Sequence, residues 1–221
     1  MKTSDNKENT PKKKDAWSVF KIMGELVNGY EQLDEVGPCV SIFGSARTKP
    51  TNPYYQLGIE IAQAIAESGY GIITGGGPGI MEAGNKGAQI GNGVSIGLNI
   101  DLPFEQTSNQ FIDKKHNLNF EYFFVRKVMF VKFSKAFIVL PGGVGTLDEL
   151  FEAITLVQTE KIKKIPIILV NVDYWTGLLD WLKNTLLAQG MINEDNLSLI
   201  QLVETKEEVL DLLDKFYPKE Q

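Results

Sequence analysis

Two acidic residues follow a glycine-rich turn in the segment LPGGVGTLDEL, residues 140–150. The turn comes directly after the apolar run AFIVL, and apolar residues at helical spacing follow it. Backbone N–H groups at the start of such a helix, aided by the helix dipole, bind anions, and phosphate above all. Asp148 and Glu149 would then lie beside a phosphate site. A carboxylate there suits chemistry that develops positive charge on a sugar, as glycosidic cleavage does.

The same residues also fit a purely structural interpretation. Thr146 to Glu149 has the sequence T-x-x-E, which is the pattern of a capping box. In that case Thr146 would cap the helix, and Glu149 would reach back to the capping residue. On spacing alone, the structural and the functional interpretations stay open side by side.

Two more glycine turns follow apolar runs, at Gly44-Ser45 and at residues 75–79. Glycine lets a ligand approach the backbone closely, although tight strand-to-helix turns also need it. The dinucleotide pattern G-x-G-x-x-G fails, because Ile80 and Asp148 take the place of its third glycine, and no G-K-[ST] of a P-loop exists. Neither a nicotinamide-dependent enzyme nor a P-loop ATPase is therefore favoured.

Other reactive side chains are scarce. GVSIG, residues 93–97, matches G-x-S-x-G, the nucleophile elbow of serine hydrolases. Ser95 lies inside an apolar run and not on the strand-to-helix turn that this motif requires, so a serine hydrolase is disfavoured. His116 is the only histidine, and we expect it at the surface. Cys39 is the only cysteine, so no intrachain disulfide can form, and most zinc sites are disfavoured. We expect no metal and no organic cofactor.

The chain alternates apolar runs with segments of helical periodicity, after a first helix at about residues 16–35. Strands are predicted at 39–45, 70–77, 93–100, 136–143, 165–171 and 198–205, and helices at 54–69, 78–91, 121–134, 145–161, 174–190 and 206–217. Residues 101–120 have no regular pattern. This order predicts a Rossmann-like α/β fold, a doubly wound parallel sheet with helices on both faces. Ligands bind beyond the carboxyl ends of such strands, where all three glycine turns lie. Met81 and Met129 fall in apolar helical patterns and are predicted to be core residues.

Composition limits the class of protein. The 221 residues carry a net charge of −6 and are 43% hydrophobic, which fits one soluble domain over residues 15–221 and gives no footprint for nucleic acid. Residues 1–14 carry five lysines and almost no apolar side chains, so we expect a disordered basic tail. Without a signal peptide or an apolar run long enough to span a bilayer, we expect a cytoplasmic protein with no membrane partner.

At this point the motifs resemble those of a known family. PGGVGTLDE, residues 141–149, resembles the P-G-G-x-G-T-x-x-E motif of the LOG ("lonely guy") family. GGGPGIMEAGNKGA, residues 75–88, resembles its other glycine motif, and VRKVMF, residues 125–130, its Arg-Lys segment. Glu82 departs from the glycine of plant-like members, and FGSAR, residues 43–47, is more similar to the longer bacterial type. The family, long mislabelled "lysine decarboxylase", comprises phosphoribohydrolases of cytokinin nucleoside monophosphates, and relatives cleave AMP.

The resemblance implies roles by position. Glu149 and Arg126 match the family's essential glutamate and arginine, and Lys127 lies beside the arginine. Substrate contacts are implied for Gly142, Gly143, Gly145 and Thr146 of the phosphate turn, and for Glu105 and Thr155. The position of the glycine turns at the strand ends predicts further contacts from Val144, Gly44, Ser45, Gly76 and Gly77. A homodimer or larger homo-oligomer, with the Arg126 helix near the interface, is implied as well.

We therefore expect hydrolysis of the N-glycosidic bond of a nucleoside 5′-monophosphate, giving free base and ribose 5-phosphate. The substrate could be AMP or a cytokinin riboside 5′-monophosphate. The alternative of a different class is a nucleotide or molybdenum-cofactor carrier of the same fold that performs no turnover. A decarboxylase is a third interpretation, which no feature of a pyridoxal site supports.

Overall fold

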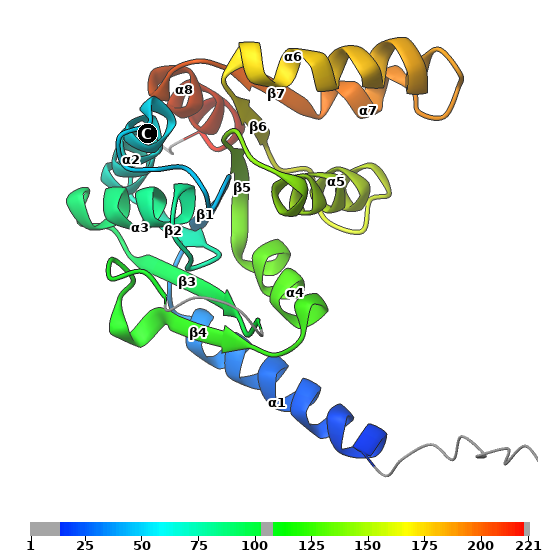
Figure 1. Ribbon diagram of the computed structural model, residues 1–221. Coiled ribbons are helices and arrows are strands. Elements are labelled where there is room, and N and C mark those ends of the chain that lie inside the picture. The colour runs from blue at the N-terminus through cyan, green and yellow to red at the C-terminus, as the bar shows by residue number, and fades with distance from the viewer. Residues whose placement is uncertain (1–13, 103–107, 219–221) are drawn as a thin grey trace, which may run out of the picture.

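The computed structural model of the protein describes residues 14–102 and 108–218. Within these ranges seven strands form one sheet in the order β4-β3-β2-β1-β5-β6-β7, and every pair of neighbours is parallel (Figure 1). The strands are β1 Cys39–Phe43, β2 Gly71–Thr74, β3 Ser95–Ile100, β4 Asn117–Phe120, β5 Ser134–Val139, β6 Ile167–Val170 and β7 Ile200–Val203. The predicted α/β fold is confirmed.

Helices cover both faces of the sheet. They are α1 Lys14–Leu33, α2 Pro53–Glu67, α3 Ile80–Ile90, α4 Phe123–Phe133, α5 Val144–Gln158, α6 Val172–Trp181, α7 Glu194–Ser198 and α8 Lys206–Phe216. A 3₁₀ turn, Lys114–His116, precedes β4, and a π-helical segment, Leu182–Leu187, extends α6. Figure 1 shows α2, α3 and α8 on one side of the sheet, with α1, α4 and α5 on the other. Each side has its own apolar core, which explains why β1, β2 and β6 are buried at every position.

One predicted irregular region contains a strand. Residues 117–120 form β4, which alternates exposed and buried positions at the edge of the sheet. Leu118 and Phe120 are buried there, whereas Asn117 and Asn119 face solvent. A strand this short, polar at every other position, carries too little apolar signal to be recognised in the sequence. The short helix α7 escaped prediction for the same reason.

The sheet reverses its winding between β1 and β5. The chain proceeds from β1 outward to β4, returns beside β1 as β5, and then continues outward to β7. The two turns that follow β1 and β5 therefore lie side by side, and the Ser45 N–H donates to the Pro141 carbonyl at 3.1 Å. A reversal of this kind opens a crevice at the carboxyl ends of the strands, where α/β proteins bind ligands.

The tail expected over residues 1–14 lies outside the described residues, except that α1 already begins at Lys14. None of the described helices has the length and apolarity needed to cross a membrane.

Candidate active site

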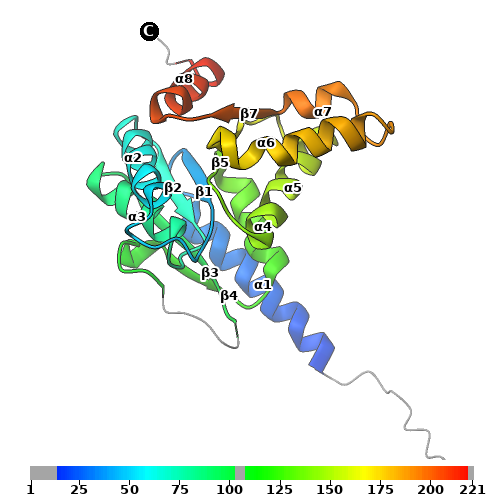
Figure 2. The same cartoon turned by 45° about the horizontal axis from the view of Figure 1, so that its top comes forward.

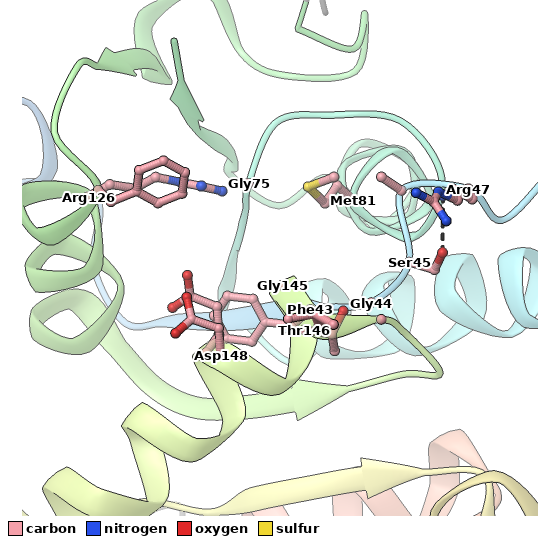
Figure 3. A pocket seen from close by; sticks show the side chains of 15 residues that line it. Phe43, Gly44, Ser45, Arg47, Gly75, Met81, Arg126, Gly145, Thr146 and Asp148 are labelled. Atoms are coloured by element: carbon pink, nitrogen blue, oxygen red, sulfur yellow. Dashed lines mark hydrogen bonds between the residues drawn. The ribbon is translucent and has the colours of Figure 1, made fainter. Parts of the chain in front are cut away.

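A cavity of about 540 Å³ lies at the reversal point of the sheet (Figure 3). Its lining comes from the turn after β1, the turn after β2, α4, and the start of α5. The lining residues are Phe43, Gly44, Ser45, Ala46, Arg47, Gly75, Met81, Phe123, Arg126, Gly143, Val144, Gly145, Thr146, Asp148 and Glu149. The structure thus brings all three predicted glycine turns to one place.

A smaller hollow of about 170 Å³ adjoins this cavity. The two share Gly75, Met81, Phe123 and Arg126. The hollow is otherwise lined by Gly76, Gly77, Asn99, Ile100, Leu102 and Ser108. Gly76 and Gly77 therefore face the second chamber, not the first.

Arg126 forms part of the wall between the two chambers. Its Nε donates to the Leu98 carbonyl at 2.8 Å, and its guanidinium lies 5.2 Å from the centroid of the Phe130 ring. Figure 3 shows the side chain reaching toward Gly75, where an added Cβ would collide with the guanidinium. Burial lowers the pKa of Arg126, and the negative charge of Glu149 opposes that shift. The guanidinium still stays charged at neutral pH, so it presents a fixed cation to both chambers.

Glu149 lies in the second turn of α5 and lines the larger chamber. Burial raises the pKa of its carboxyl to about 7, against the positive charges of Lys127 and Arg126. No cationic nitrogen of the described residues lies within 4.0 Å of this carboxylate. Glu149 is therefore a half-buried carboxyl that gains and loses its proton near neutral pH, as is typical of catalytic acids and bases.

The capping-box prediction for Thr146 and Glu149 is wrong. Helix α5 begins at Val144 with Gly143 as its N-cap, and no side chain caps it. The N–H of Thr146 and that of Leu147 both donate to the Gly143 carbonyl at 3.0 Å. Thr146 is already the third helical residue, so Glu149 lies too far along the helix to reach its start. Its carboxylate is free to face the cavity.

The glycine turn presents unpaired donors. The N–H groups of Val144 and Gly145, at the start of α5, have no backbone acceptor among the described residues. The Tyr174 hydroxyl donates to the Gly142 carbonyl at 2.7 Å and so ties the turn to α6. Gly142 does not line the cavity, but an added Cβ there would collide with the Thr146 side chain. Its place in the motif is therefore explained by packing.

A buried polar network supports the glycine turn after β2. The Thr74 hydroxyl donates to Asn85 Oδ1 at 2.6 Å and accepts from the Gly76 N–H at 3.0 Å. Asn109 Nδ2 donates to the carbonyls of Gly76 and Gly77, each at 3.1 Å. Side chains distant in sequence thus fix the turn that lines both chambers.

Two further predicted contact residues do not line the cavity, and a third lies outside the described residues. Lys127 lines a separate hollow beside α5, and its Nζ pairs with Asp148 at 2.9 Å and Glu152 at 2.7 Å. Thr155, which belongs to α5, lines the same hollow, and its hydroxyl donates to the Phe151 carbonyl. Glu105 lies outside the described residues. The structure does not bring Lys127 or Thr155 to the cavity of this chain.

Five other residues considered in the sequence analysis have clear outcomes. Ser95 is fully buried at the start of β3 and donates to the Phe111 carbonyl at 2.7 Å, so it cannot act as an exposed nucleophile. Met129 is a core residue as predicted, whereas Met81 lines both chambers. The surface prediction for His116 is wrong, because its side chain is only 13% exposed beside Asp113. Cys39 is a free, buried thiol.

Arg47, Phe123 and Asn99 are among the lining residues that the sequence did not predict. Arg47 extends the turn after β1 and adds a second cation to the larger chamber. Phe123 lies three residues before Arg126 on α4, and the helical repeat from Arg126 would have placed it on the same face. Asn99 lies near the carboxyl end of β3, the edge where ligands were expected, and lines the smaller hollow.

Comparisons with known proteins agree on one family. The family described as "Possible lysine decarboxylase" matches residues 81–213. The cytokinin riboside 5′-monophosphate phosphoribohydrolase LOG of Oryza sativa subsp. japonica is 30% identical over 180 residues, which cover 80% of this chain and 72% of that protein. The cytokinin riboside 5′-monophosphate phosphoribohydrolase of Mycobacterium tuberculosis is 32% identical over 159 residues, covering 70% and 82%.

Solved structures show the same fold at lower identity. The molybdenum cofactor binding protein of Rippkaea orientalis is 22% identical with a TM-score of 0.55, covering 81% of this chain and 96% of that one. The molybdenum cofactor carrier protein of Chlamydomonas reinhardtii is 16% identical with a TM-score of 0.54, covering 82% and 99%. At these identities the likeness establishes the architecture alone.

Proposed function

Since this chain belongs to the LOG family, we propose that it hydrolyses the N-glycosidic bond of a nucleoside 5′-monophosphate. The products are the free base and ribose 5-phosphate. One observation carries the proposal beyond family membership. Glu149, with its pKa near 7, faces a chamber that also contains the unpaired N–H groups at the start of α5.

The 5′-phosphate binds at the glycine turn. The N–H groups of Val144 and Gly145 and the dipole of α5 supply the positive potential there. Arg47, on the opposite turn, adds a full positive charge to the same chamber. Binding energy at the phosphate holds the ribose in position and so assists cleavage at the remote C1′–N bond.

The base extends toward the smaller hollow. Met81 and Phe123 line both chambers and give the base apolar surfaces. Asn99 offers a polar side chain at the far end. Arg126, between the chambers, is placed to contact the ribose or the departing base.

Glu149 performs the chemistry on the ribose. As the C1′–N bond breaks, positive charge builds on the sugar, and the ionised Glu149 carboxylate stabilises it. The same carboxylate orients the attacking water and accepts its proton. The base leaves with the bonding electron pair and takes up a proton.

A lysine-dependent decarboxylase does not fit these residues, despite the family description. A lysine that forms a Schiff base needs a lowered pKa. Lys127 is the lysine that directly follows Arg126, a residue of the larger chamber. Burial lowers its pKa, but hydrogen bonds to Glu152 and Asp148 outweigh burial and leave the pKa raised. An absorbance spectrum of the purified protein with a pyridoxal band would contradict this assignment.

We also propose that the protein forms a homodimer or a larger homo-oligomer. Helix α1 extends past the sheet (Figure 2) and exposes apolar side chains, with Trp17 70% and Phe20 64% exposed. Phe124 exposes more apolar surface on the neighbouring α4. Exposed apolar surface of this extent is typical of interaction sites. Sedimentation equilibrium of the full chain tests the proposal, and a monomer at micromolar concentration would refute it.

Product analysis tests the proposed reaction. Wild type and Glu149→Gln are incubated with AMP and with an isoprenylated AMP, and free base and ribose 5-phosphate are quantified. We expect both products from wild type, and at most traces from a variant that still unfolds cooperatively. If wild type cleaves neither nucleotide while AMP still raises its melting temperature, the protein is a nucleotide-binding protein and the hydrolase is refuted.

A further inference from the structure

Another hollow, larger than either chamber, lies near the amino ends of the strands, whereas the candidate active site lies at their carboxyl ends. It has a volume of about 860 Å³ and lies where β5 and β6 begin, between the ends of α4, α5 and α8. The lining residues are Tyr30, Val128, Val131, Lys132, Ser134, Lys135, Glu152, Leu156, Lys161, Ile162, Lys163, Lys164, Ile165, Phe216 and Tyr217. We call it the lysine groove. It shares no residue with the two chambers described above.

The charge of the lysine groove is opposite to that of the chain. Five of its lining residues are lysines, although the protein carries a net charge of −6. In the part of the chain that the structure describes, none of the five ammonium groups has a carboxylate oxygen within 4.0 Å. Glu152 is the acidic residue of the lining, and it already pairs with Lys127. The positive charge is therefore not neutralised within the groove.

The turn that carries three of these lysines has a defined conformation. Glu160 adopts a left-handed backbone with φ of 56°. The N–H groups of Lys161 and Ile162 then both donate to the Leu156 carbonyl, at 3.0 Å and 3.3 Å. A left-handed backbone is unfavourable for a residue with a Cβ, so neighbouring contacts must maintain it. The turn thus places Lys161, Lys163 and Lys164 along the lining of the groove.

Aromatic rings lie beside the charges. Tyr30 and Phe216 are 41% and 43% exposed, and the rings of Phe216 and Tyr217 meet edge to face at 5.0 Å. Lys132 Nζ lies 5.9 Å from the Tyr30 ring centroid. The groove therefore combines several cations with flat apolar surfaces on which a ring system can stack.

We propose that the lysine groove binds a small molecule bearing a polyphosphate chain. Lysines gather as point charges around phosphate, whereas planar carboxylates favour the bidentate fork of arginine, which the lining lacks. Its volume lies within the range of small-molecule sites, about 300–1,000 Å³. The chemistry common to inorganic polyphosphate and to a nucleoside triphosphate is the phosphate chain, and the aromatic rings favour the nucleoside triphosphate.

Calorimetric titration of the full chain with inorganic tripolyphosphate and with ATP tests this site. The test variant is Lys163→Ala/Lys164→Ala. The matched control is Lys114→Ala/Lys115→Ala, an adjacent exposed pair outside the groove that changes the net charge by the same amount. We expect salt-dependent binding to wild type, a loss of roughly tenfold or more in affinity for the groove variant, and a change below about twofold for the control.

Other outcomes of the titrations either overturn the proposal or identify the occupant of the groove. Absence of binding to wild type overturns the proposal. An equal loss in both variants overturns it too, because it would show attraction to positive charge in general. Binding that the groove variant leaves intact places the anion at the glycine turns and also overturns it. If ATP binds more tightly than tripolyphosphate, the occupant is a nucleotide, and equal affinities identify the phosphate chain alone.

Discussion

The chain contains the pattern T-x-x-E at the start of two helices, and the two copies have different structural roles. Thr205 and Glu208 at the start of α8 form a complete capping box: the Thr205 hydroxyl accepts from the Glu208 N–H, and Glu208 accepts from the Thr205 N–H. Thr146 and Glu149 at the start of α5 cap nothing. The exposed Glu208 has a lowered pKa because backbone N–H groups donate to it, whereas burial raises the pKa of Glu149.

The residues before the motif decide between these outcomes. Before α8 the chain leaves β7 at Val203 and reaches Thr205 in an extended conformation, so Thr205 becomes the N-cap. Before α5 the helix begins just after Gly143, three residues ahead of Thr146. That shift of almost one turn moves Glu149 from the cap position to the wall of the cavity. The glycines of the phosphate turn thus also free the glutamate.

The largest expected difference between the two copies concerns turnover. Glu149→Gln should lower the rate of AMP cleavage by about 10³-fold, because the carboxylate that stabilises the charged ribose is lost. Glu208→Gln, the matched control, should change the rate by less than about twofold. Initial rates of base release measure both. Equal effects of the two substitutions would contradict a catalytic role for Glu149.

Substitution of Arg126 gives a second test of the role of Glu149. Arg126→Gln should lower kcat/KM by about 10²-fold and move the pH at which kcat/KM is half-maximal upward. The physical reason is that the guanidinium lowers the pKa of Glu149, so its removal raises that pKa further above 7. A pH–rate profile of wild type and variant measures the shift. Lys132→Gln, an exposed position on the same helix, serves as control.

A rate loss without any shift of the pH profile would show that Arg126 acts on substrate alone. It would also show that the Arg126 charge does not reach the Glu149 carboxyl. The pKa of Glu149 would then be independent of the charge on Arg126.

The two glutamates should also change stability with pH in opposite directions. The folded pKa of Glu149, about 7, exceeds the ordinary value of 4.5, so its contribution to stability falls as pH rises between these values. Glu149→Gln should therefore stabilise the protein by about 1–3 kcal/mol at pH 8 and hardly at all at pH 4. Glu208 has a lowered pKa, so its stabilisation is present above 4.5 and is lost in acid.

Urea unfolding at several pH values measures both trends. Glu208→Gln should destabilise the protein at neutral pH and less so in acid. A Glu149→Gln variant that is less stable than wild type at pH 8 would show that the carboxyl is well solvated, and the raised pKa would be wrong.

Much of this site follows from local sequence. Three glycine turns after apolar runs locate the cavity, because parallel strands gather their carboxyl ends at one edge. Glu149 and Arg126 were found from motifs within single segments. Residues brought in by tertiary structure were not found, such as Met81, which helical periodicity assigned to the core. The capping box failed because a four-residue pattern does not record where its helix starts.

The smallest expected difference concerns the threonines. Thr205→Val removes a side-chain cap and should lower the free energy of unfolding by about 1 kcal/mol. Thr146→Val removes a hydroxyl that caps nothing, in a residue only 6% exposed, so the loss should stay below about 0.5 kcal/mol. Thr176→Val, in the first turns of α6, corrects for the general effect of valine in a helix. Equal losses at positions 146 and 205 would return Thr146 to a capping role, and Glu149 with it.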